Sequence, residues 1–574
     1  MRSTGSRLLL LIVAVPLLLA GIADKKPALK VGDLSLPKGF KSITVADTIP
    51  GAARHLAVSS SGDIYVKLRF PDKAGGNAAL RDTNGDGRAD IIQKFADYED
   101  KGTYGTAMRI YNGYLYFSSE TNIFRIKLDS SSLIPQGEPE LIIHDTGGRH
   151  EHDAKPIAFD DAGHIYVPFG AASNACQEKN RVPGSPGIKN CPLLDSAGGI
   201  WQFDANKLNQ TPKDGVRYAT GLRSVVAMAW NHANQCLYVV AHGRDDLHML
   251  FPKQFNAWQS AVLPAEEFLQ VKPGTNAGWP YYYYDPYKKQ LMLNPEYGGN
   301  GIKKGDGAKF TQPIMAFPAH WAPNDLLFYK GNQFPSRYRN GAFIAFHGST
   351  NRSPYPQAGY CIAFVPFKNG KPSGPWELFA DGFTGKQTIL SPSEATYRPM
   401  GLAEAPDGSL VISDTEKGRV WRVNFAGNKA SFGPANLQAM LQRKRTLYKD
   451  PNPITDDNSR AMLSPGASLY RKYCISCHQP DGKGDGNLFP PLAGSEWVVG
   501  GPYGDKRMAI QTLLKGLQGP VTVKGHSYNS VMPSFSQLSD KEIAEVLTYI
   551  RSKFGNNASM VTAEEVKNTR KRIR

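Results

Sequence analysis

Near the C-terminal end of the sequence, the run Cys474-Ile-Ser-Cys477-His478 has the residue types and the spacing of a haem-attachment site. Two thiols on one helical turn can add across the two vinyl groups of a haem, and the adjacent imidazole then lies beneath the iron as its fifth ligand. A Cys-x-x-Cys pair alone would also suit zinc or a redox dithiol, but the sequence has no second zinc-type Cys pair. The run therefore predicts haem c, attached through both thiols and ligated by His478.

A sixth iron ligand is expected downstream on a loop, and Met532 is the candidate. It stands before a proline that fixes the chain, and Phe535 follows as an aromatic side chain that can close the haem edge. A His/Met ligand pair raises the reduction potential and suits electron transfer rather than oxygen chemistry. Met508, on an expected helix, and His526 remain as alternatives.

Two expected helices frame this site. One begins at Ser464-Pro465 and runs into the Cys pair. The other opens with the capping-box pattern Ser539-Asp-Lys-Glu542 and presents an apolar face between Ile543 and Phe554. We therefore expect a small all-α domain at this end of the chain.

The stretch from about 460 to 555 resembles a class I cytochrome c. The resemblance includes Phe489-Pro490-Pro491-Leu492, where that family places a proline near the proximal ligand. It implies a cytochrome c domain over 461–555, followed by a basic tail over 556–574.

The first four-fifths of the chain repeats a β-hairpin pattern six times. Each copy has an apolar run, usually a turn of Gly, Asp or Asn, and a strand rich in aromatic or β-branched residues. The copies begin at Leu56, Met108, Ile157, Met228, Leu327 and Leu402. Six hairpins separated by long segments predict a six-bladed β-propeller over 35–425, with a pair of β-sandwiches as the alternative. The fold class is mainly β, a propeller followed by the small helical domain, with a linker over 426–460 that carries one short helix.

Residues 35–425 resemble the six-bladed quinoprotein dehydrogenases that use pyrroloquinoline quinone (PQQ), in particular the sorbosone and soluble aldose sugar dehydrogenases. The matching motifs lie between strands, where a propeller gathers its loops over one mouth. They are Glu151-His152, Gly221-Leu-Arg223-Ser, His242-Gly243-Arg244-Asp245, Asn276-Ala-Gly-Trp-Pro280, His347-Gly-Ser-Thr-Asn351-Arg352 and Tyr397-Arg398-Pro399. The resemblance implies oxidation of a sugar or a sugar-derived aldehyde, with PQQ and calcium as cofactors.

The resemblance also assigns two catalytic roles. His152 would be the general base that removes the proton from the substrate hydroxyl. Arg223 would polarise the quinone carbonyl that accepts hydride, and Glu151 would support His152 or the cofactor. The calcium ion would bind the backbone oxygens of Gly243 and Arg244, which form a hard oxygen site.

Arginines are the expected cofactor ligands because the quinone carries three carboxylates and a guanidinium fork matches a carboxylate. The candidates are Arg54, Arg223, Arg352 and Arg398. Arg352 or a neighbour stands where the family has Lys, and Ser224-Val225 replaces polar and Pro residues of the best-known aldose enzymes.

The N-terminal segment predicts export. Arg2 and Arg7 precede an uncharged apolar run from Leu8 to Ile22, which ends in small residues suited to a signal peptidase. An uncleaved membrane anchor is the alternative, but the run is short for a spanning helix. We assign 1–23 to a signal peptide and expect a periplasmic protein with no transmembrane segment after cleavage.

An oxidising compartment favours a local disulfide between Cys176 and Cys191, which bracket a loop rich in Gly, Pro and Asn. Cys236 and Cys361 lie in apolar runs and are expected to be buried thiols. The formal net charge of +16 favours acidic partners such as an anionic cofactor, a membrane surface or an acidic redox protein. Export and the lack of a binding module argue against nucleic acid.

These patterns predict a periplasmic quinohaemoprotein dehydrogenase that passes electrons from PQQ to its own haem. A soluble cytochrome, a quinone or an oxidase would then take them. One alternative is a non-catalytic propeller that binds a ligand or polysaccharide and presents the cytochrome. Another is a propeller lactonase, which would instead show converging Glu, Asn and Asp metal ligands.

Overall fold

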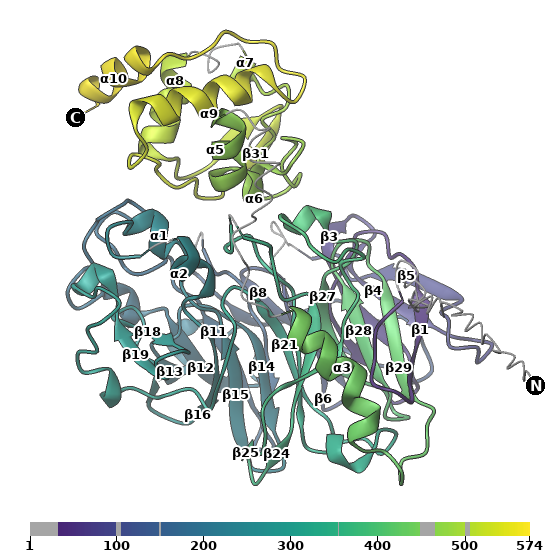
Figure 1. Cartoon of the computed structure of the whole chain (residues 1–574). Helices are drawn as coiled ribbons and strands as arrows, with labels where there is room; N and C mark the ends of the chain where they lie inside the picture. Colours follow the sequence, from purple (N-terminus) through teal and green to yellow (C-terminus); the bar gives the residue numbers. More distant parts are fainter. Residues whose placement is uncertain are drawn as a thin grey trace, which may run out of the picture.

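The computed structural model describes residues 33–98, 105–147, 151–255, 257–353, 355–447, 465–499 and 506–573. The predicted signal peptide and residues 448–464 of the chain lie outside these ranges. Figure 1 shows two bodies, a large β-structured one that holds the N-terminal part and a small helical one placed over it.

Within the described residues, the large body contains six sheets of four antiparallel strands, one of them with a fifth, parallel strand at its edge, the arrangement of a six-bladed propeller. Three of them are formed by β2 (Ala53–Val58), β3 (Ile64–Asp72), β4 (Gly75–Arg81) and β5 (Ile91–Phe95); by β6 (Met108–Tyr111), β7 (Tyr114–Ser118), β8 (Asn122–Lys127) and β9 (Glu140–His144); and by β10 (Ala158–Phe159), β11 (His164–Phe169), β12 (Gly199–Asp204) and β13 (Val216–Thr220), with β17 (Thr275–Asn276) added at the edge.

The other three sheets follow in chain order. They are formed by β14 (Val225–Asn231), β15 (Cys236–Ala241), β16 (Glu266–Val271) and β20 (Met315–Phe317); by β21 (Pro323–Phe328), β22 (Ala342–Phe346), β23 (Cys361–Val365) and β26 (Glu377–Ala380); and by β27 (Pro399–Glu404), β28 (Leu410–Asp414), β29 (Val420–Phe425) and β1 (Phe40–Ala46).

Short elements decorate the propeller. They are the ribbons β18 (Tyr282–Asp285) with β19 (Gln290–Leu293) and β24 (Phe367–Lys368) with β25 (Lys371–Pro372), the helices α1 (Leu247–Leu250) and α2 (Ala257–Val262), and the 3-10 turns η1 (Pro192–Asp195), η2 (Pro212–Asp214), η3 (Pro295–Tyr297), η4 (Gly307–Lys309), η5 (Ser336–Tyr338) and η6 (Pro392–Glu394).

Each of the six predicted hairpins forms the first two strands of one blade, so the six-bladed prediction is confirmed. The turn residues explain why the chain reverses there. Gly62, Gly113, Gly163 and Gly408 all have positive φ values, between 78° and 94°, a backbone conformation that favours glycine. The blades then pack face to face through aromatic side chains.

The ring is closed by its two ends. The first strand, β1, pairs antiparallel with the last one, β29, from Phe40 opposite Phe425 to Ala46 opposite Val420. Phe40 also packs edge to face against Phe334 and Phe379 of the neighbouring blade region. Pairing of the first strand with the last therefore closes the ring of blades and leaves no unpaired strand edge between β1 and β29.

Helix α3 (Pro434–Leu447) occupies much of the predicted linker and packs against β26. Met440 is buried in the propeller core, Arg443 pairs with Asp381, and the Lys444 ammonium lies 3.5 Å from the centre of the Trp376 ring. This part of the segment is therefore an outer layer of the propeller rather than a free connection.

The small body is helical apart from one hairpin. It consists of α5 (Pro465–Tyr473), α6 (Ile475–His478), α7 (Glu496–Val499), α8 (Lys506–Lys515), the strands β30 (Val521–Val523) and β31 (His526–Tyr528), α9 (Asp540–Ser552) and α10 (Ala563–Arg572). The capping box at the start of α9 is confirmed, with Ser539 and Glu542 each accepting from the other's backbone N–H.

Helix α5 crosses α9 at close range. A Cβ atom on Gly466 would lie 2.1 Å from the Glu545 carbonyl oxygen, so only glycine permits this approach. On the other side of the contact, Ile543, Val546 and Ile550 of α9 are buried. This helix pair is the scaffold from which the haem-attachment residues extend.

The expected basic tail is largely a docked helix. Val561 and Val566 are buried in the core of the helical domain, and Arg570 of α10 donates to Asp540 at 2.7 Å. The sequence prediction of a solvated tail gave weight to the basic residues and not to the two valines among them. Burial of these valines holds the helix against α8 and α9.

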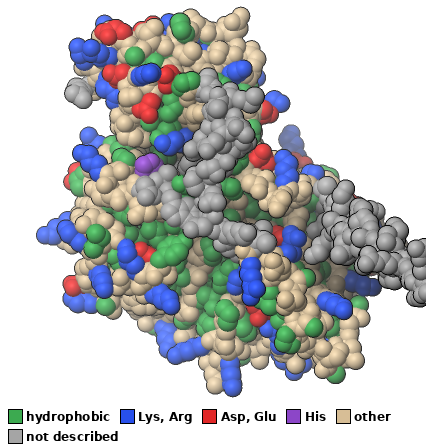
Figure 2. Space-filling view, in the orientation of Figure 1, with side chains coloured by type: hydrophobic (Ala, Val, Ile, Leu, Met, Phe, Trp, Pro, Cys, Tyr) green, Lys and Arg blue, Asp and Glu red, His purple; other side chains and the backbone are tan. Residues whose placement is uncertain are grey.

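Lys and Arg side chains are scattered over both bodies on the face shown in Figure 2. Cys176 and Cys191 form the predicted disulfide, and Cys236 and Cys361 are buried as expected. Among the described residues, none of the helices has the length and apolar character needed to cross a membrane.

Candidate functional site

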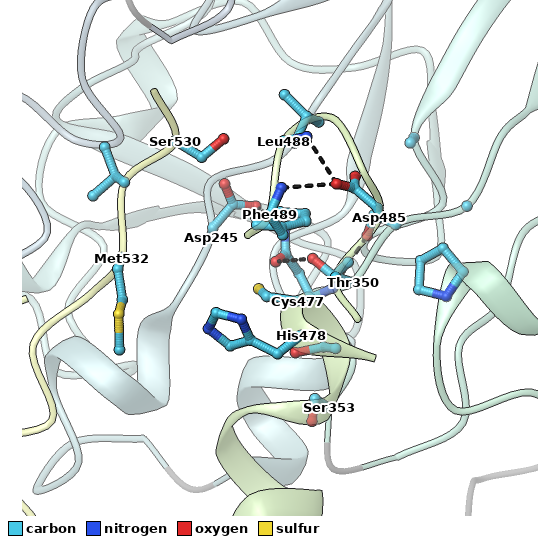
Figure 3. A pocket seen from close by; sticks show the side chains of 18 of the residues that line it. Asp245, Thr350, Ser353, Cys477, His478, Asp485, Leu488, Phe489, Ser530 and Met532 are labelled. Atoms are coloured by element: carbon cyan, nitrogen blue, oxygen red, sulfur yellow. Dashed lines mark hydrogen bonds between the residues drawn. The ribbon is translucent and has the colours of Figure 1, made fainter. Parts of the chain in front are cut away.

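A cavity of about 850 Å³ lies between the propeller loops and the helical domain, and both bodies line it. The propeller contributes His152, Arg54 and Arg398, and the helical domain contributes His478 and Met532. Figure 3 shows Asp245 of the propeller in the same pocket as the haem-binding candidates. Residues from both expected sites therefore share one enclosed space.

The predicted haem residues converge on this cavity. Cys474 precedes α6 and Cys477 lies within it, so the two thiols stand on one helical turn, and neither is in a disulfide. The His478 Nδ1 donates to the Pro490 carbonyl at 2.9 Å, which leaves Nε2 as the ligating nitrogen. Burial lowers the pKa of His478 and so favours the neutral imidazole that binds iron.

The loop that supports His478 is shaped by one carboxylate. Asp485 accepts from the backbone N–H groups of Leu488 and Phe489, at 2.8 and 2.7 Å, as Figure 3 shows. This turn brings the Pro490 carbonyl to the imidazole, as the resemblance of this stretch to cytochrome c implied.

Met532 is the sixth-ligand candidate that the cavity favours. It lies on the cavity wall, and its backbone exchanges two hydrogen bonds with Leu517, at 2.9 and 3.0 Å. Met508 and His526 are not among the residues that line the cavity, and His526 is exposed in β31. The paired thiols, the oriented imidazole and the thioether fit a haem c.

His152 is held in a special backbone conformation on the propeller side. Its φ is +62°, and its Nδ1 donates to the Ala171 carbonyl at 2.6 Å. A Cβ atom on Gly170 would lie 2.2 Å from the His152 carbonyl oxygen, so glycine is required there. Burial and the positive charge of Arg223 lower the pKa of His152 to about 4, which keeps Nε2 unprotonated near neutral pH.

Glu151 is an ionised partner of this site. Asn180 donates to it at 2.7 Å and Arg181 at 3.0 Å. Burial alone would raise the pKa of Glu151, but the charges of Arg181 and His152 hold it at about 2. Arg181 also pairs with Asp245 and Asp246, so it fixes three carboxylates at the cavity wall.

A second group of cations lines the cavity on the propeller side. Arg398 donates to His347 Nδ1 and to the Gly348 carbonyl, both at 2.8 Å, and Arg69 donates to the Thr415 carbonyl at 3.1 Å. Arg69 and Arg398 share the single carboxylate of Glu416, at 3.4 Å each.

Arg54 lines the same cavity, so three guanidinium groups from different parts of the propeller face it together with Glu416. Guanidinium groups bind carboxylates through paired hydrogen bonds, so these side chains fit a cofactor that carries several carboxylates. Sequence reasoning missed Arg69, Arg181 and Glu416. A cation alternating with apolar residues in strand β3 is the signal that could have identified Arg69.

Arg223, predicted to polarise the quinone carbonyl, is held by neighbouring propeller residues beside the shared cavity. Its Nη1 donates to Asn174 at 2.9 Å and to Asp245 at 3.0 Å, and its Nη2 donates to the Gly243 carbonyl. It is not among the residues that line the shared cavity, but it lines a small neighbouring pocket with Gly243 and Glu267. In this arrangement Arg223 orients Asp245 and lowers the pKa of His152.

One of the two backbone oxygens predicted to bind calcium already has a partner. The Gly243 carbonyl already accepts from the Arg223 guanidinium, and a cation on the same oxygen would face that charge. The Arg244 side chain is buried in an ion pair with Glu296, which leaves its backbone oxygen as the second predicted ligand. Within the described parts of the chain, no three His, Cys, Asp or Glu side chains group as metal ligands.

Arg352 is also placed elsewhere. It donates to the backbone carbonyls of Ala261 and Ala319, at 3.0 and 3.4 Å, and to that of Pro356. It is not among the cavity-lining residues, whereas its neighbour Asn351 is one and donates to Asp245 at 2.5 Å. Arg352 ties loops together because a buried guanidinium satisfies several carbonyls at once.

The fold and the cavity define a class of protein: a β-propeller whose mouth is covered by a cytochrome c domain. Residues 96–349 match the family model described as Glucose / Sorbosone dehydrogenase, and residues 463–553 match the model described as Cytochrome c. Residues 288–426 match a model described as TrAA12-like. The chain belongs to the cytochrome c family in its C-terminal domain, and its propeller is similar to the Glucose / Sorbosone dehydrogenase model over the matched residues.

Two curated relatives are similar to parts of this chain. Cytochrome c-552 of Thermus thermophilus is 44% identical over 110 residues, which are 18% of this chain and 83% of that protein. The fructose dehydrogenase cytochrome subunit of Gluconobacter japonicus is 36% identical over 251 residues, which are 41% of this chain and 46% of that protein. The chain thus spans less than half of the second relative.

Two solved structures share the propeller fold. A Trichoderma reesei protein of carbohydrate-active enzyme family AA12 is 18% identical, with a TM-score of 0.55 over 69% of this chain and 99% of that one. The PQQ domain of pyranose dehydrogenase from Coprinopsis cinerea is 16% identical, with a TM-score of 0.55 over 68% of this chain and 97% of that one. At these identities the likeness concerns the fold alone.

Proposed function

We propose that this protein is an exported quinohaemoprotein dehydrogenase that oxidises a sugar or sugar-derived aldehyde and delivers the electrons to its own haem c. The observation that carries the proposal is the single cavity lined by His152, Arg54 and Arg398 of the propeller and by Cys477 and His478 of the cytochrome domain. The residues proposed for hydroxyl oxidation and those proposed for electron acceptance line the same space, which supports direct transfer between them.

His152 would act as the general base. Its Nδ1–H is committed to the Ala171 carbonyl, so Nε2 is the atom that can take the substrate hydroxyl proton. Its lowered pKa keeps this nitrogen available near neutral pH. Glu151 stays ionised beside it and favours the imidazolium that proton transfer forms.

The cofactors would be held by side chains of both bodies. Arg54, Arg69 and Arg398 would bind the carboxylates of PQQ, whereas Cys474, Cys477, His478 and Met532 would hold the haem. When bound, the quinone supplies a two-electron acceptor and the haem a one-electron acceptor, so the two electrons from one substrate leave in two single-electron steps.

Export and the onward path of the electrons are part of the proposal. The N-terminal segment has the pattern of a signal peptide, and the Cys176–Cys191 disulfide suits a periplasmic location. The named cytochrome subunits of dehydrogenases among the relatives support transfer to a downstream one-electron acceptor.

An optical experiment tests this function. Holoprotein reconstituted with PQQ is mixed anaerobically with a panel of aldoses and sugar aldehydes while the haem absorbance is recorded. Appearance of the reduced haem bands on addition of one of them is the expected result. The proposal would be ruled out if dithionite reduced the haem but no member of the panel reduced either the haem or an added dye.

A further inference from the structure

The contacts between the two bodies gather beside the haem ligands. Gln479 directly follows His478, and its side-chain Oε1 accepts from the hydroxyl groups of Ser391 and Ser393 at the 3-10 turn η6 of the propeller. The Gln479 residue is 4% exposed. One buried side-chain oxygen of the cytochrome domain thus receives two hydrogen bonds from the propeller.

The backbone at Gln479 is fixed as well. Its φ is +68°, in the left-handed region that favours glycine, and its carbonyl accepts from the Tyr470 hydroxyl at 2.6 Å. A positive φ is less favourable for glutamine than for glycine. Glutamine, however, supplies the amide oxygen that accepts from the two serine hydroxyls. The turn after His478 is therefore held from the cytochrome side and from the propeller side.

A second contact lies on the opposite side of the haem site. Gln518 Nε2 donates to the Asn180 carbonyl of the propeller at 2.7 Å. Gln518 follows Leu517, which exchanges two backbone hydrogen bonds with Met532. The Asn180 side chain in turn donates to Glu151 at 2.7 Å, so the loop of the sixth-ligand candidate is tied to the loop that orients the His152 site.

Two further contacts between the described parts of the two bodies lie nearby. Ser353 donates to the Lys472 carbonyl at 3.1 Å, and Met249 packs against the core of the cytochrome domain. An interface held by a few hydrogen bonds contributes little affinity by itself, so each bond next to a haem ligand has a large share in setting the position of the haem.

We propose that Gln479 and Gln518 are positioning residues that hold both haem-ligating loops against the propeller mouth, so that electrons pass between the two domains at short range. This inference rests on the proposed function. Because electron transfer slows steeply with distance, loss of these contacts should slow the step between the domains without changing substrate oxidation.

The test uses full-length holoprotein with the substitutions Gln479→Gly and Gln518→Ala, singly and together. Glycine keeps the left-handed turn without strain and removes only the side chain. Gln511→Ala, on α8 and outside the cavity lining, is the matched control. Three hydrogen bonds are lost in the double variant, so substrate-driven haem reduction should slow at least about tenfold.

Two readouts separate positioning from catalysis and from folding. Turnover with a dye that takes electrons from the propeller site should stay within about twofold of the unsubstituted protein, and the haem spectrum should be unchanged. Small-angle scattering of the protein should show a larger radius of gyration for the double variant. Ser391→Ala with Ser393→Ala should reproduce the effect of Gln479→Gly and should not add to it.

Unchanged rates of haem reduction together with unchanged scattering in the double variant would overturn the inference. A normal rate of dye reduction in that case would leave the proposed function intact. Failure of the unsubstituted protein to reduce either dye or haem would count against the proposed function instead.

Discussion

The haem site and the propeller site are built in opposite ways. The haem-binding candidates come from one short part of the chain, between 474 and 532, and three of them share one turn of helix. The residues around His152 come from loops between Arg54 and Arg398 and meet only because the blades form a ring. The first site is determined by local sequence, whereas the second is determined by the closed fold.

Because of this difference, the two sites should respond differently to substitution of their residues. A local site whose members act as one unit should fail as a whole when one member is removed. A site whose charges are spread over several blades should lose affinity in steps, because each residue contributes separately. Four predictions test this contrast.

The largest effect is expected at the haem thiols. Cys474→Ser with Cys477→Ser should abolish covalent haem, because no thiol is left to add to the vinyl groups. Haem content measured on denatured, exported protein checks this. Cys236→Ser, in the buried strand β15, is the control and should keep its haem. Covalent haem in the double variant would contradict the attachment site.

His152→Ala should lower the rate of dye-coupled substrate oxidation by about 10² to 10⁴, because the general base is removed. The haem spectrum should not change. His232→Ala is the matched control, since His232 pairs with Asp161 on the surface. Comparison of the turnover rates of the two variants checks the prediction, and equal rates would show that His152 is not the base.

Two arginine substitutions compare a cavity cation with a structural one. Arg398→Gln should weaken PQQ binding by about ten- to 150-fold, because a charged hydrogen bond contributes about 1.5–3 kcal/mol. Arg352→Gln should leave this affinity unchanged and lower the melting temperature, since buried carbonyls such as that of Ala261 lose their donor. Titration with the quinone and thermal unfolding are the measurements. Similar losses of affinity in both variants would contradict the placement of Arg352.

The smallest effect is expected in the pH profile. His152 must be neutral to accept a proton, so its activity is lost as the pH falls through its pKa, which burial and Arg223 hold at about 4. Dye-coupled kcat/KM should therefore stay level from pH 8 to about pH 5 and fall about tenfold per pH unit below about 4. An inflection near pH 6.5, the ordinary value for His, would show that His152 is not the titrating base.

Patterns that depend on neighbouring residues could be predicted from the sequence. The hairpin at Gly62 and the capping box at Ser539 are set by backbone conformation and local hydrogen bonds. The spacing of the haem residues is likewise local. These interactions operate within a few residues, so the sequence contains all of the physical information that they need.

Long-range electrostatics could not be predicted in this way. Arg352 and Arg398 have the same side chain and similar surroundings in the sequence, yet one satisfies buried carbonyls and the other lines the cavity. Likewise, the partner of the Gly243 carbonyl is Arg223, twenty residues away in a neighbouring loop. Which oxygen each charged group binds depends on how the blades pack. The periodic pattern of apolar residues in the sequence does not contain this information.

The pairing of β1 with β29 has a consequence for biosynthesis. During translation, β1 is the first described propeller strand to be made, but β29, the strand that it pairs with among the described residues, ends at Phe425. Until the ribosome has passed that residue, the hydrogen-bonding edge of β1 stays open to pairing with other chains. The ring can then close while the cytochrome domain is still being synthesised, so the mouth should form before the domain that covers it.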